Sequence, residues 1–360
     1  MKTKYYFFRM LIISSLAALL AFPAGLCFAK GWSAPLDTCH KHPSGKKQKK
    51  NTVSIVSGGR CLVPSKSTKR RPKSSRIVSA SRINKKISSR SAIVMDAHTG
   101  RVLYSQAPDR PAQPASTIKI LTGLISIRAL RDKEKVKVSK KAAGMPRSKI
   151  YLERGKSYVA DDLINAVLLS SANDASVALA EKIAGSEKAF AKIMTYKAKE
   201  LGANRTICKT ASGLTSRGQQ STVRDLAVIF NKAMEDEEFA RRIGKTKIRT
   251  RYGKLLRNHN KAMWRIKGAE GGKTGYTRAA RQTYVGQFSR GKDAIVVAIM
   301  GSETMWDDIH HLVKHGFARK QQIRLASLAS ASPGSNSNST RFSSSSQPSV
   351  LDSSKKKAKL

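Results

Sequence analysis

A serine and a lysine stand three residues apart where an apolar helix is predicted to begin, and this pair constrains the chain most. Ser116 and Lys119 lie in the stretch 114–119, which opens a helix expected to run to about Leu130. On a helix this spacing places both side chains on one face. A neutral lysine beside a serine hydroxyl can take its proton and create a nucleophile. Burial and nearby positive charge both favour the neutral amine. Because a helix-capping serine and a solvated lysine have the same spacing, further signals are needed.

The composition of the chain is strongly basic. Its 360 residues include 69 Lys and Arg against 23 Asp and Glu, a formal net charge of +46. A chain of this length can form one large core or two modest ones. The charge predicts contact with anionic surroundings such as nucleic acid, anionic lipid or an acidic cell-surface polymer.

The first 29 residues indicate which of these surroundings the chain meets. Basic residues precede an apolar run from Met10 to Phe22, and small residues at Cys27 and Ala29 fit a cleavage site. This pattern is typical of a secretory signal peptide over residues 1–29. The alternative is an uncleaved membrane anchor, although the run is shorter than the roughly 20 residues that span a bilayer. We therefore expect an exported protein, periplasmic or associated with the cell envelope, and no nucleic-acid partner.

Two further segments lack the composition of a folded core. Residues 30–90 carry 17 Lys and Arg against one acidic residue, Asp37, and are predicted to be disordered. This basic segment is either an electrostatic tether to an anionic envelope surface or a solvated spacer without a specific partner. Residues 321–360 form a Ser- and Lys-rich tail with the same expectation of disorder.

The sequence does not decide between two oxidation states of the cysteines. After removal of the signal peptide, Cys39 and Cys61 either pair in an oxidising compartment or remain reduced, and Cys208 is expected to be buried. Their spacing fits no zinc site, so we expect no metal.

Residues 91–320 have the pattern of one folded domain with strands and helices. Apolar stretches at 92–95 and 101–104 flank a glycine-containing turn and predict a β-hairpin, and two long apolar strands are expected at 282–288 and 294–300. Shorter or flanking elements are expected at 149–152 (strand), 245–256 (basic strand), 160–169, 174–183 and 190–201 (a helical subdomain), and 307–317 (a closing helix).

Two polar motifs follow the Ser116–Lys119 pair along the chain. Ser171-Ala172-Asn173 stands on an expected loop between two helices, and Lys273-Thr274-Gly275 precedes an expected strand. Each motif alone is weak, but the three together, in this order and in suitable local settings, are a strong signal.

With these motifs the sequence resembles the penicillin-recognising serine D,D-peptidases, specifically the low-molecular-weight D-alanyl-D-alanine carboxypeptidases. Stretches around the motifs also fit, among them 94–104, 211–214 and 273–277. The resemblance covers roughly residues 90–318. It implies an α/β fold of the β-lactamase/D,D-peptidase type, with an antiparallel sheet flanked by helices and a helical subdomain.

The resemblance also implies a role for each motif residue. Ser116 would be the acylated nucleophile and Lys119 would take its proton. Ser171 would bridge Lys119 and Lys273 and pass a proton to the leaving D-alanine. Asn173 would hold the peptide carbonyl of the substrate and position Lys119.

The remaining implied roles concern substrate binding. Lys273 and Thr274 would bind the terminal carboxylate, and Gly275 would let the substrate lie along the strand edge. The backbone N–H groups of Ser116 and Tyr276 would form the oxyanion hole. No cofactor is expected, because acyl transfer by serine needs none.

The implied function is removal of the terminal D-alanine from peptidoglycan pentapeptides, with stem peptides ending in D-Ala-D-Ala as substrate and β-lactam antibiotics as inhibitors. Two departures stand out. Arg281 follows Ala279-Ala280 where family members often carry glycine, so the start of the next strand is in doubt. The family's β-rich C-terminal domain and amphipathic anchor helix have no counterpart after Phe317, so a soluble enzyme is expected.

Three other functions compete with this interpretation. A D,D-endopeptidase that cleaves peptidoglycan cross-links would use the same motifs. A β-lactamase would need a glutamate that activates water, for which Glu200 is the candidate, although its surroundings indicate a helix end. A non-catalytic, cationic envelope-binding protein would explain the charge but not the intact motifs.

Overall fold

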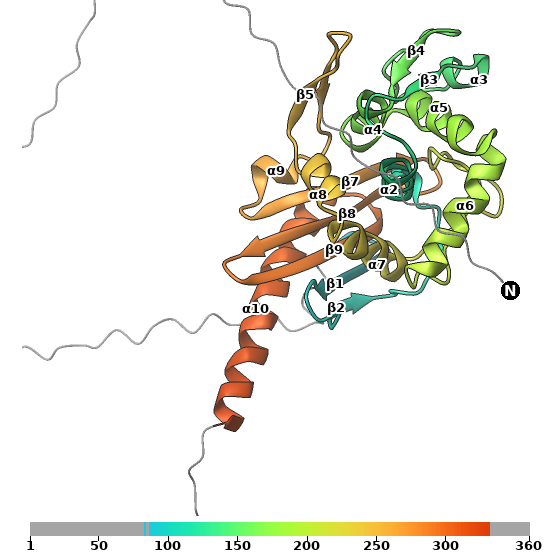
Figure 1. Ribbon diagram of the computed structural model, residues 1–360. Helices are drawn as coiled ribbons and strands as arrows, with labels where there is room; N and C mark the ends of the chain where they lie inside the picture. Colours follow the sequence, from blue (N-terminus) through green and yellow to red (C-terminus); the bar gives the residue numbers. More distant parts are fainter. Residues whose placement is uncertain (1–82, 84–85, 332–360) are drawn as a thin grey trace, which may run out of the picture. The chain divides into compact units, whose positions relative to one another are not determined.

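The computed structural model of the protein describes residue 83 and residues 86–331 (Figure 1). The predicted signal peptide, Cys39, Cys61, most of the basic segment 30–90 and most of the tail lie outside the described residues. Among the described residues, no helix is both long enough and apolar enough to cross a membrane.

A five-stranded sheet forms the centre of the fold. Its spatial order is β2-β1-β9-β8-β7, and neighbouring strands are antiparallel, as the sequence predicted for the hairpin and the two long strands. The strands are β1 (Ser91–Asp96), β2 (Val102–Gln106), β7 (Ala269–Thr277), β8 (Arg281–Arg290) and β9 (Asp293–Ser302). Strand β7 therefore lies at an edge of the sheet.

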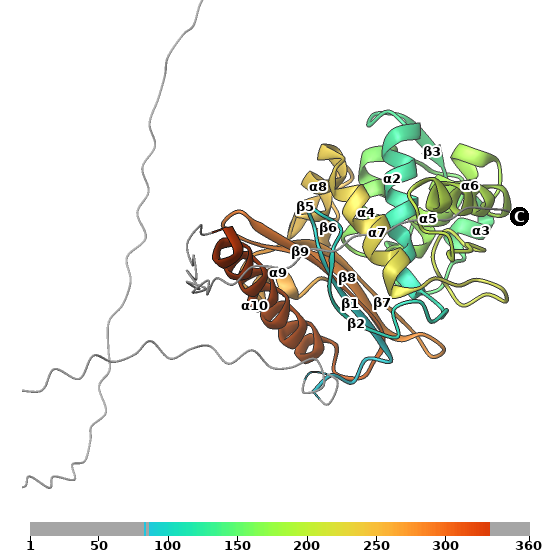
Figure 2. The same ribbon diagram turned by 90° about the horizontal axis from the view of Figure 1, so that it is seen from below.

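Both faces of the sheet are covered, and this explains the unbroken apolar run in β9. Successive side chains of a strand point to opposite faces. Val297 and Ile299 pack in one apolar cluster with helix α10 (Met305–Ala331), whereas Ala298 and Met300 pack in a second cluster with the remaining helices. Figure 2 shows α10 on one side of the sheet and α2, α4 and α7 on the other. Each large apolar side chain buried in this way contributes about 1.5–3 kcal/mol.

The helices on the second face include the predicted helical subdomain. They are the 3₁₀ turn η1 (Ala115–Ile118), α2 (Lys119–Ala129), α4 (Ala160–Leu168), α5 (Asn173–Ala184), α6 (Glu187–Glu200), α7 (Val223–Met234) and α8 (Glu237–Ile243). Short elements complete the domain: β3 (Lys135–Lys137), α3 (Lys140–Ala143), β4 (Ser157–Val159), β5 (Lys247–Arg249), β6 (Leu255–Arg257) and α9 (Ala262–Arg265).

Local capping explains where several helices begin and end. Gly185 ends α5 with a left-handed backbone (φ 72°), a conformation that glycine adopts at little cost. Ser186 follows at once and caps α6 by accepting from the backbone N–H of Ala189. Thr222 caps α7 by accepting from the backbone N–H of Asp225.

The predicted strand over 149–152 is wrong. This stretch is irregular, and the backbone N–H groups of Ile150 and Leu152 donate to the buried carboxylate of Asp174 at 3.1 Å. A side-chain carboxylate takes the place of a partner strand, which the apolar alternation alone does not reveal. The basic stretch 245–256 is not one strand either, because it forms the short antiparallel hairpin β5–β6.

The described structure continues beyond residues 91 and 320, the predicted limits of the folded domain. Before residue 91, the Ser88 and Ser89 side chains hydrogen-bond to the buried carboxylate of Asp308, more than 200 residues away in sequence. Helix α10 continues past its predicted end at residue 317 and reaches Ala331. The sequence from 318 to 331 contains no glycine or proline, so nothing in it stops the helix.

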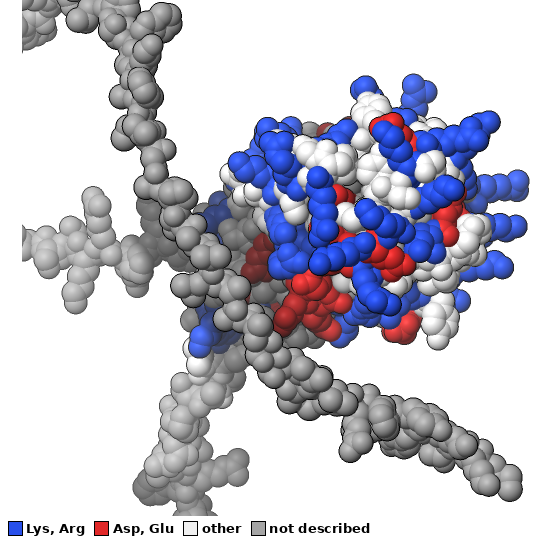
Figure 3. Space-filling model, turned by 45° about the horizontal axis from the view of Figure 1, so that its top comes forward, with Lys and Arg blue, Asp and Glu red and all other residues white. Residues whose placement is uncertain are grey.

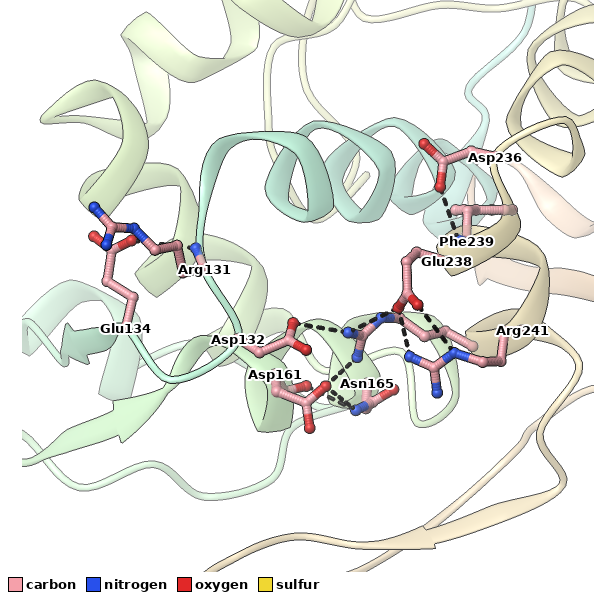
Figure 4. Close-up of polar contacts among 10 residues, drawn as sticks. Arg131, Asp132, Glu134, Asp161, Asn165, Asp236, Glu238, Phe239 and Arg241 are labelled. Carbon is pink, nitrogen blue, oxygen red and sulfur yellow. Dashed lines mark hydrogen bonds and ion pairs between the residues drawn. The ribbon is translucent and has the colours of Figure 1, made fainter. Parts of the chain in front are cut away.

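A buried arginine links three helical segments. The guanidinium of Arg242 on α8 pairs with Asp132, Asp161 and Glu238, and its side chain is only 2% exposed. Figure 4 shows these carboxylates gathered between the end of α2, helix α4 and helix α8, with Arg241 beside Glu238. The cluster therefore fixes α8 against the elements that carry the site described below.

We expect Arg242→Ala to destabilise the fold by about 3 kcal/mol, because it removes a buried ion-pair network and leaves a cavity. The neighbouring Arg241 also pairs with Glu238 but is 48% exposed, so Arg241→Ala should cost at most about 1 kcal/mol. Urea unfolding of both variants checks this difference, and equal effects would show that Arg242 is not a stabilising link.

The start of β8 contains a strained residue at the position that departs from the family pattern. Arg281 has a left-handed backbone with φ 57°, which costs a non-glycine residue about 1–2 kcal/mol. The doubt about the strand start is thereby answered: β8 begins at Arg281 despite this cost.

Arg281→Gly is expected to stabilise the protein by up to about 1 kcal/mol, since relief of backbone strain exceeds the loss of an exposed ion pair with Glu303. Arg278→Gly is the control, because Arg278 is exposed in the same turn and lacks a positive φ. Denaturant midpoints measure both changes, and a lower midpoint for Arg281→Gly than for the parent contradicts the argument.

Candidate active site

A cavity of about 410 Å³ opens beside the edge strand β7. It lies between β7, the turn η1 and the start of α5. Six of the eight predicted site residues line it: Ser116, Ser171, Asn173, Thr274, Gly275 and Tyr276. The other two, Lys119 and Lys273, are buried, and each Nζ lies within hydrogen-bond distance of a serine that lines the cavity, Ser116 and Ser171 respectively. The structure thus brings all eight together from three distant parts of the chain.

The turn η1 holds Ser116 at the cavity. Ser116 lies in a 3₁₀ turn directly before α2. The α-helix itself begins at Lys119, about one turn later than the sequence predicted. The carbonyl of Pro114 accepts hydrogen bonds from the hydroxyls of Thr117 (2.6 Å) and Thr283 (3.0 Å), which ties the turn to β8. At Gly213, where φ is 76°, an added Cβ would overlap the carbonyl of Ala115, so only glycine fits against this turn.

Lys119 makes three close polar contacts, and these bear on the protonation state of its amine. Nζ lies 2.9 Å from Ser116 Oγ, 2.7 Å from Asn173 Oδ1 and 2.6 Å from the carbonyl oxygen of Ser212. The two carbonyl oxygens can only accept, and a neutral amine has two hydrogens and one lone pair. When both hydrogens go to the carbonyls, the lone pair is left for the Ser116 hydroxyl. This is the arrangement in which a lysine acts as base towards a serine.

The surroundings of Lys119 favour that neutral state. Burial, followed by the positive charge of Lys273, holds the pKa of Lys119 well below its ordinary value. Burial and a nearby positive charge were both expected to lower the pKa of Lys119. Only the fold identifies Lys273 as the source of that charge. Burial also lowers the pKa of Lys273, to about 7. The pair therefore holds fewer protons near neutral pH than two surface lysines would.

Asn173 and Ser171 reach the site from the turn that starts α5. Asn173 is the first residue of α5 and was expected on the preceding loop. Its Nδ2 donates to the carbonyl of Pro146 at 3.0 Å, which orients Oδ1 towards Lys119. Ser171 has a left-handed backbone (φ 57°), and strain of this kind concentrates at functional sites.

Lys273 connects the Ser171 turn with β7. Its Nζ donates to Ser171 Oγ at 2.9 Å and to the carbonyl of Thr274 at 3.0 Å. Among the described residues, the hydrogen bonds of Lys119 do not include Ser171, so only the Lys273 half of the expected bridge is present. The Thr274 hydroxyl makes no hydrogen bond within the described part of the chain, and Thr274 lines the cavity.

The edge of β7 approaches Ser116 closely. An added Cβ at Gly275 would lie 2.7 Å from the backbone nitrogen of Ser116 and 3.0 Å from the Cβ of Ala115. A side chain at this position would therefore separate β7 from η1. The exposed strand edge at Thr274–Thr277 and the backbone of Ser116 face the same cavity, where an extended peptide can lie along the strand.

Sequence reasoning missed several residues of the site. The carbonyl of Ser212 was given no role, although the stretch 211–214 had been singled out. Arg147, Ser148 and His259 line the cavity from loops, and Met305 and Trp306 line it from the start of α10. Apart from that stretch, no motif indicated them, because loops and a helix end from distant parts of the chain bring them together.

The glutamate that a β-lactamase would require is not at this site. Glu200 is the last residue of α6, half exposed, and pairs with Lys197 at 2.6 Å. No aspartate or glutamate is among the residues that line the cavity. The described residues also contain no group of three or more His, Cys, Asp or Glu arranged to hold a metal ion. Cys208 is buried as expected, and burial raises the pKa of its thiol to about 12.

Known proteins share this sequence and this fold. The chain is 35% identical over 231 residues to the D-alanyl-D-alanine carboxypeptidase DacF of Bacillus subtilis, covering 60% of this chain and 58% of that protein. It is 36% identical over 247 residues to DacB2 of Mycobacterium tuberculosis, another D-alanyl-D-alanine carboxypeptidase, covering 66% of this chain and 84% of the relative. The match thus spans a little over half the length of the Bacillus relative.

Solved structures agree with these relatives. A crystal structure of a D-alanyl-D-alanine carboxypeptidase from Mycobacterium tuberculosis matches with 35% identity and a TM-score of 0.61, covering 64% of this chain and 91% of that one. Penicillin-binding protein D2 from Listeria monocytogenes, in its ampicillin-bound form, matches with 28% identity and a TM-score of 0.59, covering 64% and 98%. These matches confirm the expected α/β fold.

The family model for D-alanyl-D-alanine carboxypeptidases, Peptidase S11, matches residues 77–304. This range contains all eight residues of the site and starts before the predicted domain limit at residue 91, in agreement with the ordered contacts of Ser88 and Ser89. The chain therefore belongs to the Peptidase S11 family of D-alanyl-D-alanine carboxypeptidases.

Proposed function

We propose that this protein is a serine D-alanyl-D-alanine carboxypeptidase that removes the terminal D-alanine from peptidoglycan pentapeptides through an acyl-enzyme on Ser116. The observation that carries the proposal is the position of the Lys119 amine. Its Nζ lies 2.7 and 2.6 Å from two carbonyl oxygens, which can only accept, and 2.9 Å from Ser116 Oγ. A neutral amine that donates to both carbonyls keeps its lone pair for the Ser116 hydroxyl. Burial and the charge of Lys273 hold the pKa of this amine well below its ordinary value and so favour its neutral form.

In the acylation step, Ser116 Oγ bonds to the carbonyl carbon of the penultimate D-alanine while its proton moves to Lys119 Nζ. The oxyanion that forms lies against the backbone N–H groups of Ser116 and Tyr276. The C–N bond to the terminal D-alanine then breaks, and the proton from Lys119 reaches the leaving nitrogen through the Ser171 hydroxyl. The Lys119–Ser171 link would form once substrate fills the cavity, since catalytic hydrogen bonds often tighten only in the complex.

In the second step, water attacks the ester on Ser116. Lys119 takes a proton from the water, the C–O bond to Ser116 breaks, and the proton returns to Ser116 Oγ. The products are the tetrapeptide and the free enzyme. Lys273, while protonated, and the Thr274 hydroxyl would bind the terminal carboxylate of the substrate, because both lie at one end of the open strand edge.

β-Lactams are proposed inhibitors for the same reason. Their reactive ring carbonyl and carboxylate match the two groups that the site receives, and the Listeria relative was solved in an ampicillin-bound form. We also propose an exported, periplasmic or envelope-associated location. Lys and Arg cover much of the face in Figure 3, and Asp and Glu form smaller patches there. This charge favours contact with an anionic envelope surface.

The test is release of D-alanine from a synthetic pentapeptide by purified protein, with Ser116→Ala as control. Release by the parent and none by the variant is the expected result. Cleavage of a cross-linked dimer peptide without D-alanine release from the pentapeptide would identify an endopeptidase instead. Absence of both reactions would leave a cationic envelope-binding protein.

A further inference from the structure

A second cavity, of about 320 Å³, adjoins the active-site cavity, and its lining includes Arg147, Lys149 and Lys254 but no aspartate or glutamate. We call it the basic groove and define it by Arg147, Lys149, Tyr151 and Lys254. It shares Arg147, Ser148 and His259 with the active-site cavity, so the two are continuous. A substrate held at Ser116 can therefore extend into the groove.

The three cations of the basic groove surround one aromatic ring and face no acid. Lys254 Nζ lies 5.1 Å, Lys149 Nζ 5.4 Å and the Arg147 guanidinium 6.0 Å from the centre of the Tyr151 ring. Their only hydrogen bonds within the described residues go from Lys149 to the carbonyl of Ala143 and from Lys254 to that of Ile150. None of the three is in an ion pair there, although fifteen ion pairs form elsewhere in this part of the chain.

The groove is built into the fold before any ligand binds. Tyr151 has a left-handed backbone (φ 62°) and is 54% exposed. The residues on either side of it are anchored by Asp174, whose carboxylate accepts hydrogen bonds from the backbone N–H groups of Ile150 and Leu152. Strain and anchoring together keep the ring pointing outward.

The opposite wall of the groove is also anchored. Lys254 follows the tip of the β5–β6 hairpin, where the ring of Tyr252 contacts the ring of Tyr158 on β4, with centroids 5.0 Å apart. The backbone N–H of Arg251 donates to the Asp162 carboxylate at 3.0 Å. The hairpin thus holds the Lys254 ammonium beside the same Tyr151 ring that Arg147 and Lys149 approach.

We propose that the basic groove is a subsite for a second carboxylate of the peptide substrate, carried by a residue that precedes the terminal D-Ala-D-Ala. This inference rests on the proposed function. The terminal carboxylate has its own place at Lys273 and Thr274, so the unpaired cations of the groove serve a different anionic group. A volume of about 320 Å³ fits a side chain rather than a polymer, and cations with no competing acid favour a carboxylate.

The experiment compares synthetic peptides that end in D-Ala-D-Ala and differ only in one group. In two matched pairs, the residue one or two positions before the dipeptide carries either a free side-chain carboxylate or its amide. For at least one pair, the parent protein should show a kcat/KM about tenfold higher for the acid than for the amide. In Arg147→Gln and in Lys149→Gln/Lys254→Gln this preference should fall below about twofold.

Two controls separate a subsite from general electrostatics. Lys188→Gln/Lys192→Gln removes the same net charge from α6, away from the groove, and should retain the tenfold preference. Acylation by benzylpenicillin, which lacks a second carboxylate, should be unchanged in Lys149→Gln/Lys254→Gln and in the α6 control, because none of these four lysines lines the active-site cavity. Arg147 makes no hydrogen bond among the described residues, so Arg147→Gln tests the groove without loosening the loop.

The outcomes distinguish this inference from the function on which it rests. D-alanine release with equal kcat/KM for acid and amide peptides, or an equal loss of preference in the α6 control, overturns the subsite alone. Failure to release D-alanine from every peptide overturns the proposed function and the subsite with it.

Discussion

Lys119→Met is expected to slow the acylation of Ser116 by about a thousandfold or more. The variant has no basic amine at the position 2.9 Å from Ser116 Oγ, and a positioned base contributes about 10²–10⁴ to a rate. Pre-steady-state labelling with fluorescent penicillin measures the acylation rate constant. The fold should survive, because methionine fills most of the same buried space.

Lys119→Arg provides the matched control for charge. Arginine keeps a cation at this position but cannot give up its proton near neutral pH. If Lys119 acts as the base, this variant should be as slow as Lys119→Met. Acylation within tenfold of the parent in either variant would show that another group takes the Ser116 proton.

Replacement of Lys273 is expected to have the second largest effect, and it should change the pH profile as well as the rate. Loss of the amine in Lys273→Met removes a cation at the proposed carboxylate site and should lower kcat/KM by about 10²–10³, since a charge-assisted hydrogen bond in a buried site is worth several kcal/mol. Acylation by a penicillin ester without its carboxylate should be much less affected.

The pH dependence follows from the two lowered lysine pKa values. Lys119 has to be neutral and Lys273 protonated, so kcat/KM should rise with pH as Lys119 loses its proton and fall as Lys273 loses its own. The pKa of Lys273 is about 7, so the alkaline limb of the profile should begin near pH 7. In Lys273→Arg this limb should be absent, because the guanidinium stays charged. An unchanged alkaline limb would assign it to another group.

Lys273→Met should also stabilise the fold at low pH. An amine whose pKa is lower in the folded than in the unfolded state binds fewer protons when folded. The lowered pKa of Lys273 therefore reduces the free energy of unfolding below pH 7, and this loss is recovered as pH rises from about 7 towards 10.5. Lys273→Met removes this cost and should raise the unfolding free energy at pH 6 by a few kcal/mol, at about 1.4 kcal/mol for each unit of pKa lowering. The gain should shrink above pH 7, as thermal unfolding at several pH values would reveal.

The sequence predicted the parts of the site that depend on residue identity. Ser116, Lys119, Asn173 and Lys273 are distinctive in type and spacing, and the structure places them around one cavity. The lowered pKa of Lys119 was also predictable in principle, because a lysine can activate a serine only as an unprotonated amine. Strands β1, β2, β8 and β9 were predictable from their apolar runs. Strand β7 was not, because its sequence is rich in glycine and polar residues, and Lys273-Thr274-Gly275 lies within it rather than before a strand.

Other features depend on contacts that side-chain identity does not encode. The Ser212 carbonyl beside Lys119 is a backbone group that any residue would supply. The 149–152 loop imitates a strand because the Asp174 carboxylate replaces a partner strand. The contact between Ser89 and Asp308 joins the two ends of the domain, and nothing near either residue in the sequence predicts the other.

The most direct test of the proposed chemistry is the mass of the intact protein after incubation with benzylpenicillin, followed by mapping of the modified peptide. We expect one adduct with the mass of the whole antibiotic, located on Ser116, and no adduct in Ser116→Ala. An adduct that persists in Ser116→Ala, or no adduct in the parent protein at saturating antibiotic, would contradict the assignment of Ser116 as the nucleophile.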